Sequence, residues 1–158
     1  MGVSLSYVTT EPVSPVVRKA IEADAKRLNT ERSWWCENII FYKHPKKSKY
    51  LTGDTKLFNI GLDELFEYDD EVPEEDSGDL DDDQFMGFYD ARFILFTLAE
   101  WSRVQGVSWE VEMAGAAVAT IHAGKIEPPS LFQADASAKQ IKADDKKAPA
   151  ILAKYPNR

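Results

Sequence analysis

The hydrophobic pattern at the start of the chain predicts a strand followed by a helix. Val3, Leu5 and Tyr7 alternate with serines, which is the two-residue period of a strand with one buried face. Ser14 directly precedes Pro15, and this pair is typical of a helix N-cap followed by the first helical residue. Because apolar residues then recur at helical spacing as far as position 29, we expect a β-α unit.

Two segments rich in aromatic and β-branched residues, 34–42 and 50–60, predict the second and third strands. Between them, residues 43–49 hold Pro45 and four lysines, a composition typical of an exposed loop. We therefore expect the two strands to be joined by a basic hairpin loop.

The next apolar segment predicts a long, largely buried helix and then a strand. Aromatic and aliphatic residues between positions 85 and 103 fall on more than one helical face, and Gly106 provides a C-terminal stop. Residues 107–113 alternate between apolar and polar, with Glu110 and Glu112 on the polar side. This alternation indicates a strand that is buried on one face only.

The pattern is weaker toward the C-terminus. Residues 115–121 fit a short hairpin strand, although an alanine-rich helix is a competing interpretation. From position 133 onward the chain holds few large apolar residues and many alanines and lysines. We expect a surface helix around 136–147 and a loose end after Pro149.

The resulting order, β-α-β-β-α-β, predicts an α+β fold of the ferredoxin-like split βαβ type, with both helices on one face of the sheet. An extra C-terminal hairpin strand and a surface C-terminal helix would follow this unit. A chain of 158 residues fits one domain. We assign this domain to residues 1–132, with an acidic loop at 61–83 between the third strand and the second long helix, and treat 133–158 as an Ala/Lys-rich extension.

The net charge of −8 is distributed very unevenly. Residues 63–83, the acidic segment, hold 13 acidic residues and no base. The other 137 residues hold 14 acidic and 19 basic residues, which gives them a net charge of +5. The acidity of this protein is therefore a property of one segment and needs a local explanation.

Three interpretations of the acidic segment are open. Residues 81–83 fall where the long helix should begin, so they can cap its free N–H groups and complement its dipole. The remainder can be a solvated loop, because like charges oppose collapse. It can also be a docking peptide whose apolar residues anchor a basic protein partner while its acids steer that partner. The docking residues would be Leu65, Phe66, Tyr68, Asp69, Asp70, Glu71, Glu74 and Glu75.

The segment also resembles a calcium loop in part. Asp79, Asp81 and Asp83 occupy alternate positions as calcium ligands do, but Gln84 stands where the loop needs glycine and Asp90 where it needs glutamate. We therefore predict no specific metal site and no cofactor. The chain's own lysine loop is a further candidate to neutralise the acidic segment.

A polar sheet face is the alternative site. Ser6, Asp54, Lys56, Glu110 and Glu112 should point away from the helices, and a glutamate beside a lysine can serve as a general base that acts on an anionic substrate. The competing interpretation is an ordinary solvated sheet face with cross-strand pairs, which alternation alone already predicts.

Other chemistries find little support. Cys36 lies among aromatic residues as a buried thiol would, and nothing in the spacing brings it to His44 or His122 for nucleophilic catalysis. The four lysines of the 43–49 loop are too few to favour nucleic acid on a chain of net charge −8. The N-terminus lacks a basic region and a long apolar stretch, so we expect neither export nor a membrane span.

Together these patterns predict a small cytoplasmic protein, because a single cysteine allows no intrachain disulfide. We expect a non-enzymatic protein-binding module that uses the acidic segment to contact a basic partner, one form of which is an inhibitor-like or immunity-like protein. The alternative is a small-ligand binder or enzyme that uses the polar sheet face. A monomer and a homodimer are both compatible with the sequence.

Overall fold

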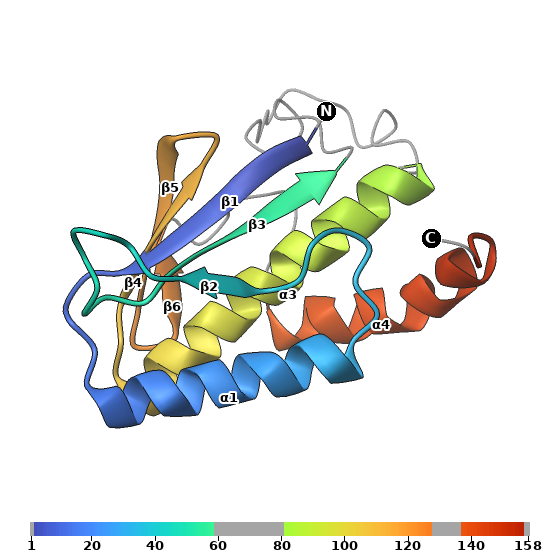
Figure 1. Cartoon of the computed structure of the whole chain (residues 1–158). Coiled ribbons are helices and arrows are strands. Elements are labelled where there is room, and N and C mark those ends of the chain that lie inside the picture. Colours follow the sequence, from blue (N-terminus) through green and yellow to red (C-terminus); the bar gives the residue numbers. More distant parts are fainter. Residues whose placement is uncertain (1, 59–80, 128–136, 157–158) are drawn as a thin grey trace.

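The computed structural model describes residues 2–58, 81–127 and 137–156 (Figure 1). These ranges form a mixed α+β fold with three helices and one sheet, which confirms the α+β part of the fold prediction. In chain order the elements are β1 (Gly2–Thr9), α1 (Pro15–Glu31), β2 (Ile40–Tyr42), β3 (Thr52–Phe58), α3 (Asp82–Gln105), β4 (Trp109–Met113), β5 (Ala116–His122), β6 (Lys125–Glu127) and α4 (Ala138–Ala153).

The sheet has six strands in the order β2-β3-β1-β4-β5-β6, and every neighbouring pair is antiparallel. β1 lies between β3 and β4, so the first strand of the chain is central. This order differs from a simple four-stranded split βαβ unit, because β5 and β6 extend the sheet beyond β4.

α1 and α3 lie against one face of the sheet, and α4 packs on the other side of α3 from α1 (Figure 1). Side chains that alternate along β1 and β4, among them Leu5, Tyr7, Trp109 and Val111, are buried on this helix-covered face. The intervening residues point to the outer face, on which the described part of the chain places no helix. The period-two pattern of the sequence therefore identified the buried face of both strands.

The boundaries of α1 and α3 follow the signals in the sequence. The Ser14 hydroxyl accepts the N–H of Val17 at the start of α1. At the start of α3, the Asp81 carboxylate accepts the N–H of Gln84 at 2.8 Å within a capping box, so this acid does cap the helix. The helix ends at Gly106, whose φ of 71° is the left-handed conformation that glycine tolerates best.

The second strand is much shorter than predicted, because residues 34–39 are irregular. Several of their backbone groups bond to side chains, while the Glu37 N–H donates to the Lys56 carbonyl of β3. The Asp90 carboxylate accepts the N–H groups of Trp35 and Cys36, and the Asn29 amide bonds both the N–H and the C=O of Ile39. Aromatic composition alone could not reveal that competition.

The strands after α3 form two tight hairpins. The hairpin interpretation of 115–121 is correct and the helical alternative is wrong, because β5 pairs back on β4. The sequence analysis missed β6, which follows a second tight turn. Both turns place two successive residues at positive φ, Ala114-Gly115 and Ala123-Gly124.

The predicted C-terminal helix exists, but its loose end after Pro149 does not. α4 continues through Pro149 to Ala153 and buries Ile141, Asp144 and Ile151. It is held by a second apolar cluster that includes Trp35, Phe85, Met86, Tyr89 and Ala148. A proline inside a helix costs one backbone hydrogen bond, and here the buried contacts on either side offset that loss.

Candidate functional site

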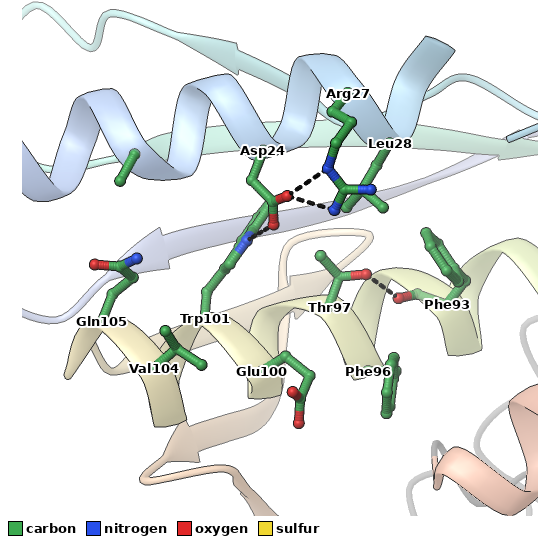
Figure 2. Close-up of a pocket in the computed structure, with 11 residues that line it drawn as sticks. Asp24, Arg27, Leu28, Phe93, Phe96, Thr97, Glu100, Trp101, Val104 and Gln105 are labelled. Carbon is green, nitrogen blue, oxygen red and sulfur yellow. Dashed lines mark hydrogen bonds and ion pairs between the residues drawn. The ribbon is translucent and has the colours of Figure 1, made fainter. Parts of the chain in front are cut away.

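A groove of about 320 Å³ lies between α1 and α3, and we call it the α1–α3 groove (Figure 2). Its walls combine six apolar side chains with five polar ones. The apolar residues are Ala20, Leu28, Phe93, Phe96, Trp101 and Val104. The polar residues are Asp24, Arg27, Thr97, Glu100 and Gln105. A concave site with mainly apolar walls and a few polar groups is the usual form of a binding site.

Helical spacing explains how these residues come together. On α1 the lining residues recur at intervals of three and four, from Ala20 through Asp24 to Arg27 and Leu28. On α3 they recur in the same way from Phe93 to Val104. Residues at such spacing share one side of a helix, so each helix contributes one continuous strip to the groove.

Asp24 is the best-positioned charged group in the groove. Its carboxylate accepts the indole N–H of Trp101 at 2.7 Å and guanidinium N–H groups of Arg27 at 2.6 and 3.1 Å (Figure 2). Burial raises the pKa of Asp24, but the hydrogen bonds from Trp101 and Arg27 outweigh burial and lower the pKa below its ordinary 3.8. Asp24 is therefore ionised at neutral pH, and it ties α1 to α3.

Two more of the polar groups are also engaged within the fold. The Thr97 hydroxyl donates to the backbone carbonyl of Phe93 at 2.8 Å. Glu100 forms an ion pair with Arg103 at 2.7 Å, and that hydrogen bond lowers the pKa of Glu100. The groove consequently presents apolar surface beside charged groups that already have partners.

The apolar surface continues beyond the groove at one end. Val104 is 62% exposed, an unusual position for a valine in a helix that buries most of its other apolar residues. Val16 is 79% exposed and lies one helical turn before Ala20, on the same side of α1. An extended apolar strip of this kind is typical of a contact surface.

The predicted docking residues of the acidic segment, from Leu65 to Glu75, lie outside the described residues. The described end of the segment shows a structural use for three acids: Asp81 caps α3, and Asp82 and Asp83 occupy its first turn. Asp82 also accepts hydrogen bonds from Lys154 and Tyr155, so it connects the start of α3 to the end of α4.

The outer face of the sheet brings together some of the alternative site residues. Ser6 lies directly opposite Asp54 on one side and Glu112 on the other, so these three form one row across β3, β1 and β4. Lys56 pairs with Ser4 and Glu110 with Val8, four residues apart along β1. At about 3.3 Å per residue, Lys56 and Glu110 are therefore roughly 13 Å apart along the strand direction.

Lys56, Glu110 and Glu112 are exposed on this face, while Ser6 and Asp54 are half-buried. The backbone N–H of Lys56 donates to the Glu37 carboxylate. The α1–α3 groove, a cavity of about 370 Å³ at the end of α1 and a cavity of about 340 Å³ beside the β2–β3 loop are lined by other residues.

Cys36 and the two histidines have separate local partners. His44 accepts the N–H of Lys46 within the β2–β3 loop, and His122 shares a 2.6 Å hydrogen bond with Ser108 at the end of β5. The Cys36 side chain packs against both apolar clusters. Among residues 2–58, 81–127 and 137–156, no group of three His, Cys, Asp or Glu side chains is arranged to hold a metal ion.

The predicted basic loop forms part of a third cavity, of about 340 Å³. Arg18 of α1 reaches across to this loop and donates to the carbonyls of Ser48 and Tyr50. Lys43 lines the cavity, and Lys47 lies 5.7 Å from the centre of the Tyr50 ring. The loop is therefore fastened to α1 by Arg18, which sequence reasoning did not anticipate.

Comparisons with known proteins give no further guide: no family model matches the chain, and neither the curated proteins nor the solved structures searched contain a significant match. No helix in the described ranges is long and apolar enough to cross a membrane.

Sequence analysis missed the α1–α3 groove because its key contacts join residues far apart in the chain. Asp24 and Trp101 are separated by 77 positions. The helical spacing of Ala20, Asp24 and Leu28 was a signal in the sequence, but nothing in the sequence showed which element faces that side of the helix.

Proposed function

We propose that this chain is a non-enzymatic protein-binding module that binds a basic partner. In this proposal an apolar segment of the partner lies in the α1–α3 groove. The observation that carries the proposal is the apolar strip of the groove, which runs from the half-buried Leu28 and Phe93 to the exposed Val104. An apolar strip between two helices suits an amphipathic segment that lays its apolar side into a groove.

The polar groups of the groove favour binding over catalysis. Asp24, Thr97 and Glu100 each have a hydrogen-bond partner within the fold, which leaves them poorly placed to transfer a proton to or from a substrate. The Asp24–Trp101 hydrogen bond instead joins the two walls, α1 and α3, directly. A preformed site of this kind lowers the entropic cost of binding.

The charge of the chain supports a basic partner. The acidic segment carries 13 acidic residues without a base, and a surface of that charge attracts basic proteins and speeds their association. Within it, Leu65, Phe66 and Tyr68 remain proposed as anchors, and Asp69, Asp70, Glu71, Glu74 and Glu75 as steering charges. A cytoplasmic location and an inhibitor-like role belong to the same proposal.

The test uses a defined probe, a synthetic amphipathic helical peptide with leucine on one side and lysine on the other. Binding is followed by the backbone amide chemical shifts of the full chain. The proposal expects shifts along α1 and α3, and it expects Val104→Glu to weaken binding by about tenfold through loss of apolar contact.

The matched control is Tyr42→Glu, which replaces another exposed apolar residue on β2 and adds the same charge. An added negative charge by itself strengthens the attraction for a basic peptide, so a loss confined to Val104→Glu must come from the groove. Equal affinities for the two variants would rule out the groove as the binding site. Deletion of residues 67–79 should separately slow association and reduce its salt dependence.

The register of the outer face supports a second candidate, a small-ligand binder or enzyme on the polar sheet face. Ser6 between Asp54 and Glu112 forms a row of one hydroxyl and two carboxylates. The ferredoxin-like assignment also remains a proposal, supported by the β2-β3-β1-β4 part of the strand order.

A further inference from the structure

A second cavity of about 370 Å³ adjoins the α1–α3 groove, and Leu28 and Phe93 line both. It lies where the end of α1 meets α3 and α4, and we call it the three-helix cavity. Its apolar walls add Ala148, Pro149 and Leu152 from α4. A partner segment that fills the groove would therefore reach the three-helix cavity with its next side chains.

The polar lining of the three-helix cavity comes from all three helical regions. It consists of Glu31, Arg32, Ser33, Tyr89 and Asp145. Two of these residues are carboxylates and one is an arginine, so the effective charge depends on how far the arginine is neutralised.

Arg32 is neutralised inside the fold. Its side chain is only 8% exposed, and it donates to the Asp90 carboxylate at 2.7 Å. Its guanidinium also lies over the rings of Tyr89, Phe93 and Trp34, at 3.8, 4.2 and 4.7 Å from the ring centres. Arg32 is thus a fixed part of the wall whose charge is already matched.

The charges of the two carboxylates, Glu31 and Asp145, are less fully compensated within the fold than the charge of Arg32. Glu31 is paired with Arg27 at 2.8 Å but is 61% exposed. Asp145 accepts the Tyr89 hydroxyl at 2.6 Å, and within the described ranges it forms no ion pair. Burial raises the pKa of Tyr89 to about 12, so this hydroxyl is a neutral donor at pH 7 and leaves the negative charge of Asp145 uncancelled.

Two of the lysines at the C-terminal half of α4 have contacts elsewhere. Lys147 lies over the Phe85 ring and Lys154 pairs with Asp82, both toward the start of α3. The three-helix cavity thus combines apolar walls with a net negative lining. Its chemistry is complementary to a lysine side chain, which has an apolar stem and a cationic end.

Resting on the proposed function, we infer that the three-helix cavity receives a lysine side chain of the same basic partner. The methylene stem would lie along Leu28, Phe93 and Leu152, and the ammonium group would meet Asp145 and, at the rim, Glu31. The Tyr89 hydroxyl holds the Asp145 carboxylate in place for this contact.

The experiment measures affinities of the full-length protein by isothermal titration with the amphipathic leucine–lysine peptide. Each lysine next to the leucine side is replaced in turn by norleucine, which keeps the stem and removes the charge. The same peptides are titrated against Asp145→Asn, in which the side-chain carbonyl can still accept from Tyr89. Thermal unfolding verifies that the variant is folded.

At one lysine position of the peptide, we expect the loss of affinity caused by Asp145→Asn to depend on the presence of that lysine. Asp145→Asn should lower the affinity for the peptide with lysine at that position by about three- to tenfold. The affinity for the corresponding norleucine peptide should stay nearly unchanged. The matched control Glu127→Gln removes one negative charge from the exposed edge strand β6 and should weaken the affinity for the two peptides equally, if at all.

Equal effects of Asp145→Asn on all peptides would overturn the lysine site. If Val104→Glu still weakens binding in that case, the groove stands and only the lysine site is wrong. If the parent peptide fails to bind the unmodified chain, the proposed function and this inference fall together.

Discussion

The helix layer and the outer face of the sheet both carry charged side chains, but they place them in different surroundings. On the helix-covered side, Arg32 and Arg92 are 8% and 6% exposed, and each meets a buried carboxylate at 2.7 Å. On the outer face, Lys56, Glu110 and Glu112 are exposed to solvent. Solvent weakens an exposed charge pair to below about 1 kcal/mol, whereas breaking a buried pair costs several times more. The position of a charge relative to the helices, rather than its presence in the sequence, therefore determines its energetic role.

The largest effect expected from this contrast is at Asp144. Its carboxylate receives two hydrogen bonds from Arg92, at 2.7 and 2.8 Å, and joins α4 to α3. Asp144→Ala would leave the Arg92 charge buried without its partner, so the free energy of unfolding should fall by about 3–5 kcal/mol. Urea denaturation followed by tryptophan fluorescence measures the change.

The double variant Arg92→Met, Asp144→Leu is the control for that substitution. It removes both charges and keeps apolar volume, so it should recover most of the lost stability. A double variant as unstable as Asp144→Ala would mean that the geometry of α4, and not the buried charge, accounts for the loss.

A smaller loss is expected at Gly53, where β3 faces the helices. A Cβ atom added there would lie 2.4 Å from both the Ile40 carbonyl oxygen and the Tyr7 ring, which closes the space for any side chain. Gly53→Ala should therefore cost about 1–3 kcal/mol of unfolding free energy through overpacking. The comparison variant is Lys56→Ala, three residues along β3 on the outer face. Similar losses for the two variants would contradict the distinction between the faces.

The sequence predicted well those features that depend on neighbouring residues. Alternation identified the buried side of β1 and β4, and local caps identified Ser14, Asp81 and Gly106 as helix boundaries. Prediction from the sequence failed where a side chain far away in the chain binds the backbone groups or the charge of a segment. Residues 34–39 are irregular because a carboxylate 54 or 55 positions away accepts two of their N–H groups.

The candidate site shows the same limit. The polar sheet face was predictable, since alternation places its residues, but the pairing of Ser6 with Asp54 and Glu112 required the strand order. The α1–α3 groove and the three-helix cavity depend on how three helices meet, and no local pattern specifies that arrangement. Alanine and lysine content suggested that α4 was a surface helix, while one aspartate and a few apolar residues hold it against α3.

A pH-dependent effect is expected at Asp24. Its pKa in the folded chain is below the ordinary value, so the folded state binds fewer protons there than the unfolded state. The resulting stability is present above about pH 4 and is lost as the pH falls through the lowered folded-state pKa. Asp24→Asn, which keeps an acceptor for Trp101, should cost about 0.5–1 kcal/mol at neutral pH and less in acid. Urea unfolding at both pH values tests this, and a cost independent of pH would assign it to packing alone.

The smallest effect is expected at Glu112, on the outer face. Glu112 is exposed and lies opposite the small side chain of Ser6, so Glu112→Gln should change the free energy of unfolding by less than about 0.5 kcal/mol. The size of this effect tests whether the two carboxylates of the Asp54–Ser6–Glu112 row repel each other. If removal of one carboxylate instead stabilises the chain by more than about 1 kcal/mol, the row stores electrostatic repulsion. Such repulsion is a property of ligand sites rather than of ordinary solvated sheets, and it would favour the outer face over the α1–α3 groove as the functional surface.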